Sequence, residues 1–449
     1  MRPNEIRRQI NLKVIAFSEA LTFANPKSLA REITILLVVC LLAGAWAVFQ
    51  FSQFEFTRLC RGFDLWFDSD PARTVANIKS RWAPFHERSF IHPLYSLFIA
   101  APFGALGEIF GLRTYTLTAL YVAAQSACYG GASYLAMRLF GLFHIDAILG
   151  VVLLYSTASG IYWIGFPEWI AFGATTVLIS VVWVAGPVRG YVSGVAQNLI
   201  SGSVVVTSWA VGFAASLLAD WPKLDWRRAY THTKDALAFI AALTVLQYLI
   251  IPTAGRFLTI WTYFGLFSPG SVRRPLHELT TEFFATTLVA PEPGVIQGPR
   301  TGPGWGTLIM TSQQQGVPLT PLTIMVLALW AILLTLGVRA ATRGCIRANV
   351  SLFVGGTIAF LFALHTLFGG EVFLFSLHFA PLLTFVALWG ATSRNKLVVR
   401  VLCTLLIAAS LAHNYPSFTS AVAIHNAVDA SWLERSHGLA EFLVRMDCG

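Results

Sequence analysis

Apolar runs of about 20 residues recur along almost the whole chain, and each is long enough to cross the hydrocarbon core of a bilayer. Charged residues make up 12% of the sequence, about half the share in a soluble domain. We therefore predict an all-α, polytopic transmembrane helical bundle. The same pattern excludes a soluble enzyme, a disordered chain and a nucleic-acid-binding protein.

The first apolar run, 32–54, has 23 residues and would form a helix of about 34 Å, so we interpret it as a membrane span and expect no cleavable signal peptide. Segment 1–31 is polar and carries six basic residues, which predicts a cytoplasmic N-terminus. Ten further spans are predicted, at 114–137, 143–163, 167–186, 191–206, 208–221, 235–252, 322–338, 350–369, 372–390 and 397–413.

Segment 91–111 is apolar enough to span, but it opens with His92-Pro93 and contains further proline and glycine. The charge pattern decides its placement, because basic residues concentrate in cytoplasmic loops. If 91–111 does not cross, the cytoplasmic loops hold Arg138, Arg189 and the basic clusters at 223–234, 339–347 and 394–400. We therefore interpret it as a juxtamembrane or re-entrant element and expect about eleven spans.

These spans divide the chain into an N-terminal transmembrane module, 32–252, and a set of C-terminal transmembrane helices, 322–415. The module contains a first external loop, 55–113. A second external loop, 253–321, is rich in glycine and proline, and 416–449 is predicted to be an external tail. Neither loop is large enough for an independent domain.

Six cysteines are scattered along the sequence without the spacing of a metal site. Four of them lie in or beside apolar spans, which is typical of small core residues. Cys60 and Cys448 could both face an oxidising compartment, where a disulfide between them could form.

The first external loop carries three aspartates within seven residues, Asp64, Asp68 and Asp70, followed by Pro71. Asp68 and Asp70 flank a single serine, so an extended backbone would point both to one side. Such a pair can hold a metal or share a proton, or one member can act as a base that the other positions. The alternative is an ordinary solvated loop with a turn-forming aspartate before proline.

Basic and aromatic residues alternate in the second half of this loop, where Arg81, His86, Arg88 and His92 are interleaved with rings. Guanidinium groups pair with phosphate oxygens in a bidentate way, so the segment suits an anionic headgroup. The alternative is an interfacial belt in which these side chains only reach toward the headgroups.

Further polar residues mark turns on the same predicted face. Glu168 and Glu371 lie at span ends, where a carboxylate can be functional or can favour a helix N-terminus, and His378 lies two turns deeper than Glu371. The second external loop adds Arg256, Arg273 and Arg274. Convergence on one face indicates a site more strongly than any member does alone.

The order of these features resembles the GT-C superfamily of polyprenyl-phosphate-dependent membrane glycosyltransferases. An acidic external loop (Phe67-Asp68-Ser69-Asp70) is followed by a His-Pro motif (His92-Pro93-Leu94-Tyr95) and a carboxylate-bearing turn (Phe166-Pro167-Glu168-Trp169). The resemblance covers roughly 32–220. It departs from the family in having one proline in the His-Pro motif and Asp-Ser-Asp in place of adjacent acids.

The resemblance implies an inverting transfer of a sugar from a polyprenyl-phosphate donor to an acceptor hydroxyl, with Asp68 or Asp70 as base. The acceptor would be a glycan, a lipid or a protein, at the external face of a membrane, with the bacterial plasma membrane preferred. Asp68 and Asp70 could hold a divalent cation, but no metal or other cofactor is predicted. A membrane transporter or flippase and a non-catalytic scaffold subunit of an envelope assembly stay open as alternatives.

Overall fold

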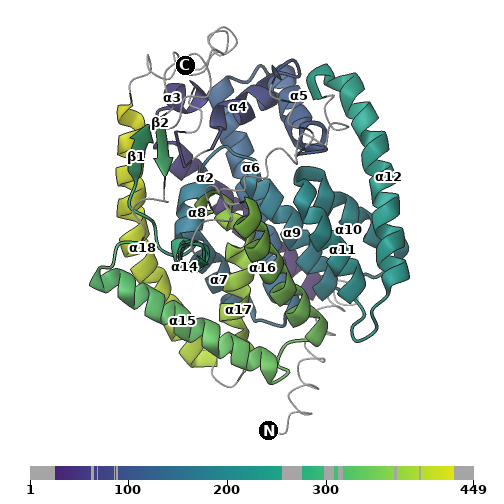
Figure 1. The fold of residues 1–449 in the computed structure, drawn as a ribbon, viewed down its shortest axis with the longest axis vertical. Coiled ribbons are helices and arrows are strands. Elements are labelled where there is room, and N and C mark those ends of the chain that lie inside the picture. Colours follow the sequence, from purple (N-terminus) through teal and green to yellow (C-terminus); the bar gives the residue numbers. More distant parts are fainter. Residues whose placement is uncertain are drawn as a thin grey trace.

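The fold is seen in a computed structural model of the full chain (Figure 1). It describes residues 26–61, 65–67, 69–84, 86, 89, 91–254, 276–297, 308–311, 317–368, 372–393 and 396–428. The described chain is almost entirely helical, as predicted, with one small antiparallel ribbon of strands β1 (Gly294–Gln297) and β2 (Leu308–Thr311) in the second loop.

Within the described ranges, five helices are long and apolar enough to cross a membrane: α2 (Pro26–Phe51), α12 (Trp226–Ile250), α15 (Pro321–Thr342), α16 (Ala348–Phe368) and α18 (Lys396–Ala427). They confirm a multi-pass membrane protein. α18 continues through Pro416 to Ala427, so the predicted boundary between 415 and 416 falls inside a helix.

Several predicted spans are shorter or broken helices. They are α7 (His144–Ser156), α8 (Ala158–Trp163), α9 (Ile170–Ala185), α10 (Tyr191–Val204), α11 (Trp209–Leu218), α17 (Ala380–Leu388) and the 3-10 helices η3 (Val206–Ser208), η7 (Phe373–His378) and η8 (Trp389–Thr392). At 14 and 10 residues, α10 and α11 are about 21 and 15 Å long and form a hairpin that does not reach across a 30 Å core. The count of about eleven spans therefore stays a prediction.

Tertiary hydrogen bonds explain the break between α7 and α8. The backbone N–H groups of Ala158 and Ser159 donate to the carbonyl oxygens of Leu288 and Thr287, each at 3.1 Å. These carbonyls follow α14 (Leu276–Thr281) and the π-helix η6 (Glu282–Thr286), so a segment from the second loop takes the place of the next helical turn.

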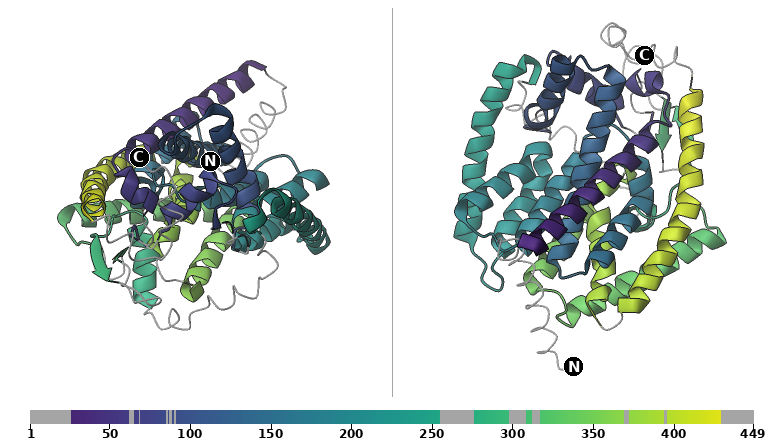
Figure 2. Two further views of the ribbon diagram at one scale, coloured as in Figure 1. Left: turned by 90° about the horizontal axis from the view of Figure 1, so that it is seen from above. Right: turned by 180° about the vertical axis from the view of Figure 1, so that it is seen from behind.

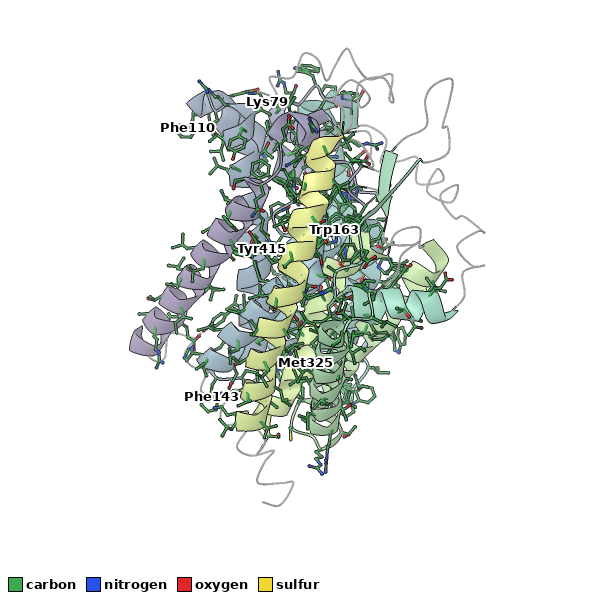
Figure 3. The ribbon with its side chains drawn as sticks, turned by 90° about the vertical axis from the view of Figure 1, so that its left-hand side faces the viewer. Lys79, Phe110, Phe143, Trp163, Met325 and Tyr415 are labelled. Carbon is green, nitrogen blue, oxygen red and sulfur yellow. The ribbon has the colours of Figure 1, made fainter. Side chains whose placement is uncertain are left out.

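The first loop folds at one end of the bundle into α3 (Phe56–Arg61), α4 (Pro71–Lys79), the π-helix η2 (Ser96–Ala100) and α5 (Ala101–Phe110). Together η2 and α5 have about 15 residues, or ~22 Å of helix. Both ends of this element lie near α4, because Lys79 Nζ donates to the Leu112 carbonyl oxygen at 3.3 Å and His86 bonds to Ser96. Figure 3 shows Lys79 and Phe110 at the same end and Phe143 toward the other. This arrangement supports the juxtamembrane interpretation of 91–111.

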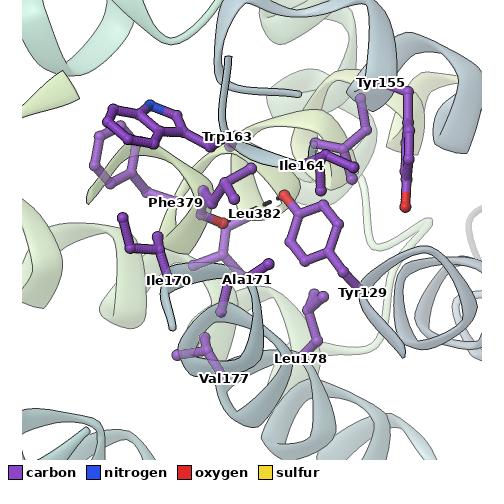
Figure 4. Packing of buried hydrophobic residues seen from close by; sticks show 14 of the residues in the cluster. Tyr129, Tyr155, Trp163, Ile164, Ile170, Ala171, Val177, Leu178, Phe379 and Leu382 are labelled. Atoms are coloured by element: carbon purple, nitrogen blue, oxygen red, sulfur yellow. Dashed lines mark hydrogen bonds between the residues drawn. The ribbon is translucent and has the colours of Figure 1, made fainter. Parts of the chain in front are cut away.

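The central helix is α6 (Thr114–Leu139), against which α2 packs obliquely along its length (Figure 2). Ser126 Oγ donates to the Ala43 carbonyl oxygen at 2.8 Å, and Tyr155 Oη donates to the Ser126 carbonyl oxygen at 2.7 Å. Tyr121, Tyr129 and Tyr134 of α6 are buried, with Tyr129 packed among Ile164, Leu178 and their neighbours (Figure 4).

Two ion pairs, each between a buried carboxylate and a partly buried arginine, fix the end of the bundle away from α4. Arg138 at the end of α6 pairs with Glu32 of α2 at 2.5 Å, and Arg400 of α18 pairs with Asp146 of α7 at 2.5 Å. Since α6 begins beside α5 and ends at Leu139, next to Arg138, its 26 residues separate the two ends by about 39 Å.

Candidate functional site

A small, partly open pocket lies between the first loop and the bundle, and it gathers residues from distant parts of the sequence. Its volume is about 30 Å³, which is enough to hold a water molecule. Four of the predicted site residues line it: Asp70, His86, His92 and Glu168. Its other lining residues are Arg73, Thr74, Asn77, Ser89, Tyr95, Ser96 and Trp169.

A tight turn with strained backbone carries Asp70 into the pocket. The Ser69 N–H donates to the Trp66 carbonyl oxygen at 3.1 Å, and Phe67 between them has φ +49°, a left-handed value that a bulky residue rarely adopts. The buried Phe67 ring contacts the rings of Tyr162 and Phe373 at centroid distances of 5.5 and 5.2 Å. Burial of this ring holds the turn in a conformation that its backbone alone would not favour.

Asp70 occupies the N-cap position of α4 without capping it. Its φ of −117° and ψ of 61° lie outside the α region, as expected for a residue before Pro71, although the backbone is not extended. The side chain makes no capping hydrogen bond, and it is only 6% exposed. Asp70 Oδ2 instead lies 3.3 Å from Nε of Arg73. The carboxylate is therefore directed to the pocket rather than to the helix end.

His86 lines one side of the pocket and joins Ser80 to Ser96 through its two ring nitrogens. Its Nε2 donates to the Ser80 carbonyl oxygen at 3.0 Å, and its Nδ1 accepts from the Ser96 hydroxyl at 2.7 Å, which fixes the tautomer with the proton on Nε2. The ring is buried, and burial lowers the pKa of His86 to about 4. At neutral pH this side chain connects the loop to η2 without adding charge.

His92 is held by the turn of the α10–α11 hairpin. Its Nδ1 donates to the Val204 carbonyl oxygen at 2.8 Å, so in the neutral ring Nε2 is the acceptor nitrogen. The imidazole lies against the Trp169 ring at a centroid distance of 4.1 Å. Backbone hydrogen bonds from Val206 to Ile91 and from Leu94 to Ser203 join the same two segments.

Glu168 lies on a turn that α6 holds in place. Gln125 Nε2 donates to the carbonyl oxygens of Ile164 and Phe166 at 3.3 and 2.7 Å. The Tyr121 hydroxyl donates to the Glu168 carbonyl oxygen at 3.3 Å. The carboxylate is 6% exposed, and a buried carboxylate at a membrane boundary is a functional candidate because its burial is costly.

Two other predicted site residues lie outside the pocket. The exposed Arg81 places its guanidinium over the Trp82 ring at 5.0 Å, as an interfacial-belt residue would. His378 is buried behind Trp169, with ring centroids 6.1 Å apart, in space that the absent side chain of Gly173 provides. Six predicted site residues fall outside the described residues: Asp68, Arg88, Arg256, Arg273, Arg274 and Glu371.

One face of α4 is the main feature that sequence reasoning missed. Thr74 and Asn77 lie one and two turns beyond Asp70 on that face, beside Arg73, and all three line the pocket. In the described part of the chain, no donor contacts the buried Asn77 Oδ1. Pro71 is typical of a first helical position, so a helix starting there would have predicted this shared face.

Among the described side chains, no group of three or more His, Cys, Asp or Glu residues is placed to hold a metal ion. The pocket combines two carboxylates, two histidines and an arginine, groups that can transfer protons and contact anions. In comparisons with protein-family models, curated proteins and solved structures, we found no match for this chain.

Proposed function

We propose that the chain is an integral membrane glycosyltransferase that moves a sugar from a polyprenyl-phosphate donor to an acceptor hydroxyl. One observation carries the proposal: Asp70, His86, His92 and Glu168, which are up to 98 positions apart, line one buried pocket at the edge of an apolar bundle. A lipid-linked donor accounts for a polar site at such a place. The resemblance of the surrounding motifs to the GT-C superfamily supports the same assignment.

In the proposed reaction, the acceptor oxygen forms a bond to the anomeric carbon while the bond from that carbon to the phosphate oxygen breaks. The hydroxyl proton passes to the Asp70 carboxylate, and the polyprenyl phosphate leaves as an anion. Arg73, next to Asp70, supplies positive charge near the leaving group. Asn77 Oδ1 is an acceptor suited to a sugar or substrate hydroxyl, and the small volume suits one reacting hydroxyl.

Capping is the main structural alternative for Asp70, because aspartate is preferred at helix N-caps. Its carboxylate makes no capping bond, whereas Asp225 at the N-cap of α12 accepts a hydrogen bond from the Arg228 N–H at 3.0 Å. Asp225 therefore serves as a matched control for Asp70. Both are aspartates at helix starts, and only one of them lies in the pocket.

We propose that the pocket faces the external side of a bacterial plasma membrane. Cys60, in the loop that also carries Asp70, is disulfide-bonded, and disulfides persist in oxidising compartments. The predicted partner, Cys448, lies outside the described residues. Cys40, Cys128, Cys345 and Cys403 are free thiols; Cys345 and Cys403 are buried, as predicted for core residues, whereas Cys40 is half-buried and Cys128 is exposed.

The direct test uses purified protein in lipid nanodiscs and a panel of polyprenyl-phosphate hexoses and pentoses, with release of polyprenyl phosphate as the readout. Asp70→Asn should lower turnover by a factor of about 10² to 10⁴, because a positioned base is lost while the shape is kept. Asp225→Asn should retain turnover. Normal turnover of Asp70→Asn would remove the mechanistic centre of the proposal.

A transporter is the second candidate, favoured by the break between α7 and α8 and by the α10–α11 hairpin, because discontinuous helices form transport sites in membranes. Proteoliposomes loaded with the same lipid-linked sugars distinguish the two. Movement of the intact donor across the bilayer without release of polyprenyl phosphate would favour the transporter.

A further inference from the structure

A second polar pocket lies at the opposite end of α12 from the candidate site. At one end of this helix, Gln247 Nε2 donates to the Pro93 carbonyl oxygen at 2.9 Å, beside His92. At the other end, Trp226 begins the helix about 32 Å from Gln247. The pocket there has a volume of about 350 Å³, and we call it the arginine pocket. It is lined by Arg189, Tyr191, Asp225, Arg227, Arg228, Thr231 and His232.

Two of its arginines are fixed by the protein. Arg189 donates to the carbonyl oxygens of Trp183 and Val184 at the carboxyl end of α9, the latter at 2.6 Å. Arg228 pairs with Asp220 and donates to the Arg189 carbonyl oxygen at 2.8 Å. Each guanidinium has five N–H donors, so these contacts orient the groups without using all of their donors.

The third arginine is available for a ligand. Arg227 is exposed, and within the described chain its guanidinium pairs with no carboxylate. The nearby carboxylates are engaged elsewhere: Asp225 caps α12, and Asp235 accepts a hydrogen bond from the Tyr191 hydroxyl. Three arginines and one aspartate line the pocket, and Asp220 beside it pairs with Arg228, so an excess of one positive charge remains.

Other guanidinium groups lie close to Arg189. Burial, with Arg347 and Arg228 close by, lowers the pKa of Arg189 to about 10. Arg347 reaches the same helix end by donating to the Ala185 carbonyl oxygen. A negatively charged ligand would relieve the repulsion among these guanidinium groups, and phosphate oxygens match their bidentate geometry.

The surroundings indicate a lipid as the source of that phosphate. Trp221, Trp226 and Tyr230 are 39%, 60% and 64% exposed around the arginine pocket, together with the apolar Val192 at 78%. Exposed tryptophan and tyrosine mark the depth of the headgroups in membrane proteins. Basic pockets between helices at this depth bind the headgroups of anionic lipids.

We propose that the arginine pocket binds the phosphate headgroup of an anionic phospholipid, with Arg227 as the adjustable ligand and Arg189 and Arg228 as fixed ones. This site is independent of the proposed transferase reaction. It would attach the peripheral helix α12, only about a fifth of whose apolar stretch is buried, to the leaflet opposite the candidate site.

The test is native mass spectrometry of the full chain released from nanodiscs that contain phosphatidylglycerol and phosphatidylcholine in equal amounts. Wild-type protein should retain phosphatidylglycerol preferentially. Arg227→Gln should retain it about fivefold less, as expected for the loss of one basic residue near an anionic headgroup. Arg339→Gln, which removes an exposed arginine of α15 outside the pocket, should retain it as wild type does.

Three outcomes would overturn the proposal. They are equal retention of both lipids by the wild type, equal losses in Arg227→Gln and Arg339→Gln, and displacement of the lipid by millimolar inorganic phosphate, which would indicate a soluble anion instead. Because Arg227 is exposed and forms no ion pair in the described chain, the variant is expected to fold, and its apparent Tm in phosphatidylcholine alone should equal that of wild type.

Discussion

Replacing Phe67 by glycine and by alanine would measure the strain in the turn that precedes Asp70. Both variants lose a fully buried ring, a change that costs about 3–5 kcal/mol in protein cores, so both should be less stable than wild type. The two variants differ in how well the new residue tolerates the backbone conformation at position 67. At φ +49° alanine costs about 1–2 kcal/mol, whereas glycine adopts this conformation freely.

The expected order of the two variants is the reverse of the usual one. At ordinary backbone angles, alanine is more stable than glycine by about 0.4–1 kcal/mol, because glycine gives the unfolded chain more freedom. At position 67 the left-handed cost exceeds this term, so Phe67→Gly should be more stable than Phe67→Ala by about 1 kcal/mol.

Equilibrium unfolding in mixed detergent micelles measures this difference, and Ser80 provides the matched control. Ser80 has φ −147° and ψ 127°, so Ser80→Ala should be more stable than Ser80→Gly there. If alanine were the more stable residue at both positions, the turn would not hold position 67 in the left-handed region, and the account of how Asp70 is presented would be refuted.

Two further predictions concern His86 and the orientation of the chain. Because the pKa of His86 falls to about 4 on folding, its stabilising contribution is complete above pH 6.5 and declines as the pH falls toward 4. Unfolding measurements should show a loss of about 2 kcal/mol between pH 7 and 5 that is absent in His86→Gln. Cysteines introduced at the exposed Arg81 and Lys223 should react from outside intact cells with an impermeant reagent at 81 alone. Labelling at 223 would show that the predicted orientation is wrong.

The sequence predicted which ionisable residues line the pocket better than it predicted where the helices begin and end. Asp70, His86, His92 and Glu168 stand out because charged and imidazole groups are rare in so apolar a chain, and rarity is visible without a structure. Arg73 and Asn77 were missed because their position on one face depends on where α4 begins.

Hydropathy predicted continuous membrane spans where the structure has interrupted helices, and the difference has a physical reason. The helix breaks between α7 and α8 because a carbonyl oxygen about 130 positions away accepts the N–H of Ala158, and α10 ends at Val204, whose carbonyl oxygen accepts a hydrogen bond from His92. Such contacts join segments that are distant in the sequence, so no local window contains them. The helical class and the long spans, by contrast, follow from local composition alone.

The length of α10 also limits how far the candidate pocket can lie from the opposite membrane surface. Fourteen residues extend at most about 21 Å, and the turn that follows them contacts His92 directly. If Tyr191 begins at the boundary of a hydrocarbon core of about 30 Å, the pocket floor lies ~9 Å or more beneath the other boundary. Any tilt of α10 increases this depth. A water-soluble substrate would have to descend to reach Asp70, whereas a lipid-borne one would enter sideways at its own level, so the bilayer thickness itself would govern access.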